Sequence, residues 1–93
     1  MPAEEDRLIG EAQSGNREAL SQLVSSYWQQ IYRFISYKTG SPEDAQELTQ
    51  ETFFRAFRSL PNYQKTNASF KTYLSHIAHN LVYDFWRKRR HSP

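Results

Sequence analysis

Cysteine is absent from this 93-residue sequence, and only three glycines occur in it. Without thiols the chain cannot form disulfides, cysteine-ligated zinc fingers or a thiol nucleophile. Three scattered glycines do not make the glycine-rich loop that cradles phosphates in nucleotide-binding enzymes. Apolar runs are only a few residues long, which is too short to cross a bilayer, and the acidic start MPAEEDRLIG does not resemble a signal peptide. We therefore expect a cytoplasmic protein that has no cofactor, no membrane segment and no enzymatic activity.

Helical periodicity is what the sequence does contain. Apolar residues recur at steps of three and four in every long segment, and no segment alternates with a period of two. This spacing predicts helices over residues 4–14, 17–38 and 42–60, then a polar loop over residues 61–68 and a last helix that ends near residue 89. The predicted fold class is all-α, a compact bundle of three main helices plus a short N-terminal helix. A chain of this length predicts one domain over residues 1–93.

The expected helix ends carry residues that are typical of helix caps. Asn16 and Ser41 are suited to cap the N-termini of the second and third helices, and Asn67 or Ser69 can cap the fourth. Gly40 is suited to the left-handed residue that ends a helix. Leu48, Phe57, Ile77 and Leu81 occupy the inward stripes of the last two helices, and we expect these four side chains to pack together.

Charge is divided unevenly along the chain. Residues 1–60 carry nine acidic and six basic side chains, whereas residues 61–93 carry one acidic and six basic side chains. The front of the chain is therefore acidic and the back is basic, although the net charge is only +2. Such a division suggests two partners of opposite charge, or an ordinary surface that ends in a basic tail.

The third helix has a polar strip outside its apolar stripe. Steps of three and four bring Asp44, Glu47 and Glu51 close together, with Gln50 and the aromatic Phe54 beside them. Nothing in the pattern separates the carboxylates into a buried acid and an exposed base, so catalysis is not supported. The strip is either a solvated helix face or a docking surface for a basic partner.

The fourth helix has a basic outer face. It carries Lys71, Thr72, Ser75, His76, His79, Asn80, Tyr83, Arg87, Lys88, Arg89 and Arg90. Cations suit phosphate contacts, and amides and imidazoles can read base edges. The alternative for the basic residues is an ordinary solvated helix end. Nearby aromatic rings could stack on unpaired bases or could simply pack in the core, and they are Tyr63, Tyr73 and Trp86. Two histidines three residues apart do not make a tight metal site, so no metal is expected.

Two adjacent segments carry a family resemblance. DAQELTQETFFRAFRSLPNY, residues 44–63, resembles a signature of bacterial sigma factors of the extracytoplasmic-function group, and SFKTYLSHIAHNLVYDFWRKRR, residues 69–90, resembles the pattern that follows it. The matching positions are Asp44, Ala45, Glu47, Leu48, Gln50, Glu51, Phe53, Arg55, Ala56 and Phe57, then Phe70, Thr72, Leu74, Ile77, Ala78, Asn80, Asp84 and Arg87. Residues 16–40 fit the looser start of the same family.

The resemblance implies the second conserved region of a sigma factor, the domain that binds core RNA polymerase and the minus-ten promoter element. The implied polymerase-binding residues, which face the clamp coiled coil of the β′ subunit, are Asp44, Glu47, Gln50, Glu51, Phe54 and Arg55. The implied DNA-binding residues are Asn62, Tyr63, Gln64, Lys65 and Asn67 in the loop that holds a flipped base, and Lys71, His76, His79, Asn80, Tyr83, Arg87, Lys88, Arg89 and Arg90 on the helix that contacts the non-template strand. An anti-sigma factor is a further partner implied by the family.

The sequence departs from the family pattern at several places. The family's second domain, which reads the minus-thirty-five element, has no counterpart here, so we expect one domain of a two-domain protein. His76 and His79 stand where arginine is usual, and Tyr73 and Trp86 replace a common tryptophan and a common leucine or isoleucine. The alternative function is a helical protein-interaction module whose basic tail is incidental.

Overall fold

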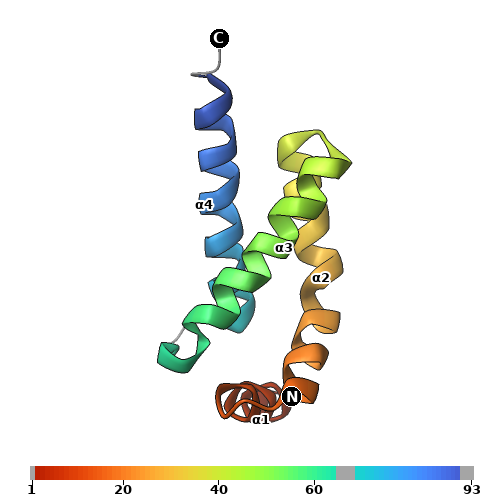
Figure 1. The fold of residues 1–93 in the computed structure, drawn as a ribbon. Helices are drawn as coiled ribbons and strands as arrows, with labels where there is room; N and C mark the ends of the chain where they lie inside the picture. Colours follow the sequence, from red (N-terminus) through yellow and green to blue (C-terminus); the bar gives the residue numbers. More distant parts are fainter. Residues whose placement is uncertain (1, 65–68, 91–93) are drawn as a thin grey trace.

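A computed structural model describes residues 2–64 and 69–90, and these residues form helices and their connections with no strand (Figure 1). The elements are α1 (Pro2–Gln13), α2 (Arg17–Thr39), α3 (Pro42–Ser59), the 3₁₀ turn η1 (Leu60–Asn62) and α4 (Phe70–Arg90). The predicted all-α fold is confirmed. The predicted boundaries agree to within two residues, and the main difference is that Leu60 belongs to η1 instead of ending α3.

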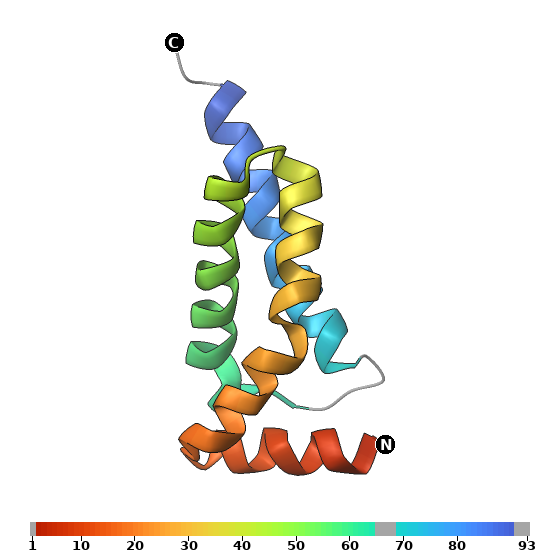
Figure 2. The same cartoon turned by 90° about the vertical axis from the view of Figure 1, so that its right-hand side faces the viewer.

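The three long helices form the bundle, and α1 closes one end of it. Helices α2, α3 and α4 pack against one another, and α1 packs against α2 and η1. In Figure 2, α1 lies across the end of the bundle at which α2 begins, and η1 and the first turn of α4 lie at this same end. The opposite end holds the turn between α2 and α3 and the last turns of α4.

Local capping explains where the helices begin. Asn16, Ser41 and Ser69 each accept a hydrogen bond from the backbone N–H three residues later, at 3.2, 3.3 and 3.2 Å. These bonds satisfy backbone donors that have no partner inside the helix. Gly40 ends α2 with a φ of 71°, a left-handed conformation that glycine adopts without steric cost. The sequence predictions at these positions are confirmed, except that Asn67 lies outside the described residues.

The core lies between all three long helices. The largest side chains that are almost fully inaccessible to solvent are Leu23 and Ile35 of α2, Leu60 of η1, and Phe70 and Leu74 of α4. The prediction of four core residues in the last two helices was only partly right. Leu81 is buried, but Leu48, Phe57 and Ile77 are half-buried and pack on the edge of the core, because the bundle turns their sides of α3 and α4 toward solvent.

Two threonines in α3 are buried without loss of hydrogen bonding. The hydroxyls of Thr49 and Thr52 donate to the carbonyl oxygens of Ala45 and Leu48, one turn earlier, at 2.6 and 2.7 Å. Because the partner is in the same helix, a threonine can replace an apolar residue at a fully packed position. Apolar periodicity alone missed Thr49, which is fully buried.

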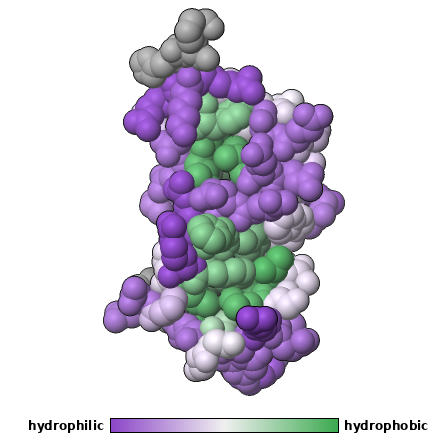
Figure 3. Space-filling model, in the orientation of Figure 1, coloured by the Kyte–Doolittle hydropathy of each residue, from purple (hydrophilic) through white to green (hydrophobic). Residues whose placement is uncertain are grey.

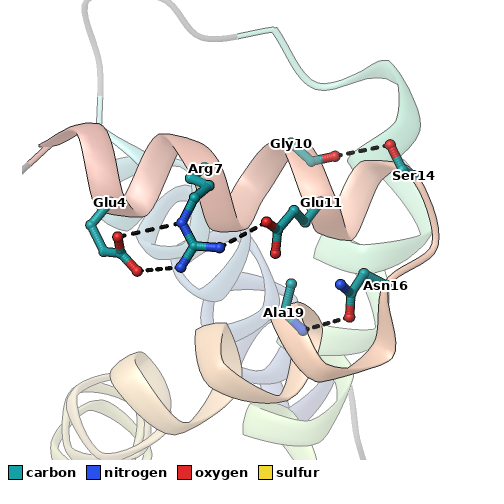
Figure 4. A network of polar contacts seen from close by, with 7 residues as sticks. All are labelled: Glu4, Arg7, Gly10, Glu11, Ser14, Asn16 and Ala19. Carbon is teal, nitrogen blue, oxygen red and sulfur yellow. Dashed lines mark hydrogen bonds and ion pairs between the residues drawn. The ribbon is translucent and has the colours of Figure 1, made fainter.

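Helix α1 is held by polar contacts as well as by packing. Its solvent face carries an ion network in which Arg7 bridges Glu4 and Glu11 (Figure 4). The hydrogen bond from Arg7 holds the pKa of Glu4 below its usual range. On the side toward the bundle, the hydroxyl of Tyr27 in α2 donates to the carboxylate of Glu5. Burial, together with this hydrogen bond, raises the pKa of Tyr27 to about 12.

Candidate nucleic-acid and partner interfaces

The acidic strip predicted on α3 is a real surface with an apolar floor. Glu47 and Gln50 are exposed, and Asp44 and Glu51 are half-buried. Asp44, Glu47 and Glu51 line a hollow of about 230 Å³ between α3 and α4, together with Leu48 and Phe85. Figure 3 shows hydrophobic surface on this face of the molecule, bordered by hydrophilic side chains. Such a hollow can accept an apolar group while its rim binds cations.

The C-terminal half of the strip contains two arginines with different partners. Arg55 donates to the carboxylate of Glu51 at 2.9 Å, one turn away on the same helix. Arg58 lies over the exposed ring of Phe54, with the guanidinium carbon 5.3 Å from the ring centroid. The carboxylates thus dominate the N-terminal half of α3, and an aromatic–cation pair dominates its C-terminal half.

The outer face of α4 is as accessible as predicted. Lys71, His76, His79, Asn80, Tyr83, Arg87, Lys88 and Arg89 are all exposed. Cations at the two ends of this face enclose imidazole, amide and phenol groups in the middle. Within the described part of the chain, no group of three or more acidic or histidine side chains is placed to hold a metal ion, and no helix is long and apolar enough to cross a bilayer.

The two predicted surfaces meet at the C-terminal end of α4. Arg89 donates to the carboxylate of Asp44 at 3.1 Å and also lies over the ring of Phe85, 4.6 Å from its centroid. Arg87 instead pairs with Asp84, one turn earlier, at 3.2 Å. One residue predicted to bind DNA is therefore paired with one residue predicted to bind polymerase. The sequence places these two residues 45 positions apart and gives no signal of the contact.

The stem of the loop that follows α3 is packed against aromatic side chains. Asn62 and Gln64 are exposed, whereas Tyr63 is half-buried. The ring of Tyr63 lies 4.7 Å from that of Tyr73 and 5.8 Å from that of Phe70, centroid to centroid. Core packing, one of the two interpretations of Tyr63 and Tyr73, is therefore what the structure shows for most of both rings. Lys65 and Asn67 lie outside the described residues.

Gln13 holds this stem from the other end of the chain. Its side-chain amide in α1 donates to the carbonyl oxygens of Leu60 and Tyr63, at 3.1 and 2.8 Å. The sequence gives no signal of this role, because a glutamine at the end of a short amphipathic helix is typical of an ordinary surface residue. The structure makes it the link between α1 and the loop.

Trp86 is not the core residue that its aromatic ring suggested. It is 42% exposed, and its indole nitrogen donates to the backbone carbonyl oxygen of Lys38 at 3.0 Å. This bond satisfies one of the carbonyl groups at the C-terminal end of α2, which have no partner within the helix. It also fixes the position of α4 relative to the end of α2.

Comparisons with known proteins place these surfaces in a family. The model of the Sigma-70 region 2 family matches residues 23–92. An extracytoplasmic-function RNA polymerase sigma factor of Streptomyces coelicolor, BldN, is 36% identical over 83 residues, which are 89% of this chain and 31% of BldN. The chain thus spans about a third of the length of that relative.

Two solved structures share the fold. One is the RsbN–BldN complex, with a TM-score of 0.79 and 36% identity over 86% of this chain and 58% of that chain. The other is an engineered region 2 of sigmaE in complex with GTAAAA, with a TM-score of 0.81 and 27% identity over 96% of this chain and 94% of that chain. Each similarity extends over most of the bundle described above.

Proposed function

The chain belongs to the Sigma-70 region 2 family and is a region 2 domain of the extracytoplasmic-function group; from this we propose that it joins core RNA polymerase to the minus-ten element of promoters. The observation that carries the proposal is the separation of charge between two helices. The carboxylates of α3 border an apolar hollow, and the cations of α4 flank groups able to read bases. The domain acts in the cytoplasm by binding alone, without catalysis.

The outer face of α4 and the stem of the loop form the DNA side. The relative that binds GTAAAA is similar to this chain over nearly its whole length, which supports a single-stranded ligand. Asn80 and the two histidines stand in the middle of the face and are suited to contact base edges, while Lys71, Arg87 and Lys88 are suited to contact phosphates. Capture of an unpaired base by the loop offsets the cost of a few kcal/mol for flipping it out of the duplex.

A labelled single-stranded GTAAAA tests the DNA side. We expect the purified chain to bind it more tightly than a scrambled hexamer in fluorescence anisotropy. Asn80→Ala should reduce that preference without changing the salt dependence, because the residue contacts bases and not phosphates. Lys71→Gln is the matched control, which should weaken binding to both hexamers and flatten the salt dependence. Equal binding of all sequences by the wild-type chain would support the alternative, an interaction module with an incidental basic surface.

The α3 strip forms the polymerase side. We propose that Asp44, Glu47, Gln50 and Glu51 meet a basic surface of the β′ clamp, with Phe54 and Arg55 at the edge. Glu47 is exposed, so reversing its charge leaves the fold intact while it opposes the partner. Loss of one close charge pair at an interface is worth about 1.5 kcal/mol or more, which is tenfold or more in affinity.

A pull-down on core polymerase tests this side. Glu47→Lys should weaken retention by about tenfold or more, and adding Glu51→Lys should weaken it further. Glu18→Lys is the matched control, because Glu18 is an exposed carboxylate in the first turn of α2, on a different part of the surface. Equal retention of the Glu47 and Glu18 variants would contradict the assignment.

A regulatory protein is the second kind of partner that we propose. BldN, 36% identical to this chain, is seen in a complex with RsbN, which supports a protein partner for this domain too. An anti-sigma factor that covers the α3 strip would block the polymerase. Its binding should therefore be reduced by Glu47→Lys and prevented by an excess of core polymerase.

A further inference from the structure

Helices α2 and α4 carry three of the exposed aromatic side chains of the bundle. Tyr37 is 85% exposed, Tyr83 is 64% exposed and Trp86 is 42% exposed. Only one other large apolar side chain among the described residues is comparably exposed, and it is Phe54 on α3. Exposed apolar side chains that gather in one patch are a mark of a binding surface.

A contact between the two helices brings the end of α2, which carries Tyr37, to the part of α4 that carries Tyr83 and Trp86. The bond from Trp86 to the carbonyl oxygen of Lys38 brings α4 to the end of α2. The ammonium of Lys38 lies 5.8 Å from the ring centroid of Tyr37 and 5.9 Å from that of Phe34. Tyr83 precedes Trp86 by three residues and so lies one turn earlier on nearly the same face of α4. We name Tyr37, Lys38, Tyr83 and Trp86 the aromatic platform.

The charge around the aromatic platform favours a polyanion. Four of the ten acidic residues lie in α1, which closes the other end of the bundle (Figure 2). Glu43 and Asp44 begin α3 at the same end as the platform, and Asp44 is paired there with Arg89. Residues 29–39 of α2 contain Arg33 and Lys38 and no carboxylate. The one carboxylate of α4, Asp84, is paired with Arg87, and Lys88 is exposed nearby. A protein partner with an acidic surface would fit this charge, but exposed rings flanked by cations are what single-stranded nucleic acid stacks on.

We propose that the aromatic platform binds the bases of single-stranded DNA beyond those read at the loop and the middle of α4. This inference rests on the proposed DNA-binding function and extends the DNA surface onto α2. Trp86 lies 16 residues after the start of α4, which is about 24 Å along the helix axis. A stacked strand rises about 3.4 Å per nucleotide, so roughly seven nucleotides separate the loop from the platform. Only a strand longer than a hexamer then engages both.

Oligonucleotide length tests the inference. Labelled GTAAAA is compared with the same hexamer carrying six thymidines at its 5′ end or its 3′ end. We expect one of the two extensions to bind the wild-type chain at least fivefold more tightly than the hexamer, since stacking on an aromatic side chain is worth a measurable gain per base. The double variant Tyr37→Ala/Lys38→Gln should lose this gain and keep the hexamer affinity. Tyr37→Phe should keep the gain, because it keeps the ring.

The chain offers a matched control on a different helix. Phe54 and Arg58 form a second exposed ring beneath a cation, on α3. Phe54→Ala/Arg58→Gln removes the same two kinds of group as the platform variant and should leave binding of all three oligonucleotides unchanged. Thermal melting by circular dichroism should show that both double variants are folded, because all four side chains are on the surface.

The outcomes separate the two proposals. If the chain bound GTAAAA and its scrambled control equally, the proposed function would fail and the aromatic platform with it. If GTAAAA bound specifically but neither extension added affinity, or if the platform variant kept the gain, only the platform would be refuted. If the platform variant and the Phe54/Arg58 variant lost the same part of the affinity gain, the platform would also be refuted, because the effect would then come from the loss of positive charge in general.

Discussion

Gln13 offers a direct test of how the loop stem is held. We consider Gln13→Met, which keeps the length and the unbranched shape of the side chain and removes both hydrogen-bond donors. The carbonyl oxygen of Leu60 keeps a partner, because it also accepts from the backbone N–H of Tyr63 at 2.9 Å. The carbonyl oxygen of Tyr63 loses the shorter of the two bonds from Gln13, the one of 2.8 Å.

The expected loss in the free energy of unfolding follows from this difference between the two carbonyl acceptors. One of the two acceptors retains a backbone donor, and the other can be reached by water because Tyr63 is only half-buried. We therefore expect a loss of about 1 kcal/mol, in the range of a typical net hydrogen bond and well below the penalty for a fully buried unsatisfied group. In a domain of this size, about 1 kcal/mol lowers the melting temperature by roughly 4–8 °C.

Two measurements check the prediction. Urea unfolding followed by circular dichroism gives the free energy of unfolding, and hydrogen exchange at the Tyr63 amide reports local opening of the stem. Gln22→Met is the control, because Gln22 is an exposed glutamine of α2. We expect faster exchange at Tyr63 and weaker binding of GTAAAA in the Gln13 variant alone. If the two variants had the same stability and the same exchange rate, Gln13 would not hold the stem.

Three further predictions concern the core, the pH dependence of stability and the Arg89 contact. Leu74→Ala in the centre of the core should cost about 2–5 kcal/mol in urea unfolding, and a cost below about 1 kcal/mol would mean that α4 packs differently. The pKa of Tyr27 is raised from an ordinary value near 10, so the stability from its bond to Glu5 should be complete below pH 10 and be lost as the pH rises through about 12. Tyr27→Phe should flatten this loss in unfolding curves recorded between these two pH values. Asp44→Asn should change the free energy of unfolding by less than about 1 kcal/mol, because the ion pair of Asp44 with Arg89 is partly exposed. The same variant should strengthen DNA binding by freeing Arg89, and an unchanged affinity would show that Arg89 does not contact DNA.

The amino-acid sequence alone determined the helices and the family. Capping and helix-ending residues such as Asn16, Gly40 and Ser41 act through bonds within four residues of themselves, so they can be recognised without knowledge of the rest of the fold. Apolar periodicity then predicted the helices and part of the core. It failed at Thr49, whose hydroxyl is satisfied inside its own helix, and at Leu48, Phe57 and Ile77, which are half-buried at the edge of the core.

The tertiary structure decided how the predicted surfaces are joined. Arg89 meets Asp44, Gln13 meets the stem at Leu60, and Trp86 meets Lys38, in pairs that are 45, 47 and 48 residues apart. Each contact depends on the angle and the register at which two helices pack, and many side chains together set both. Periodicity tells which face of a helix is buried, but not which residue of another helix lies opposite. For this reason the sequence predicted a polymerase-binding strip and a DNA-binding face separately, and only the folded chain showed that an ion pair connects the two surfaces.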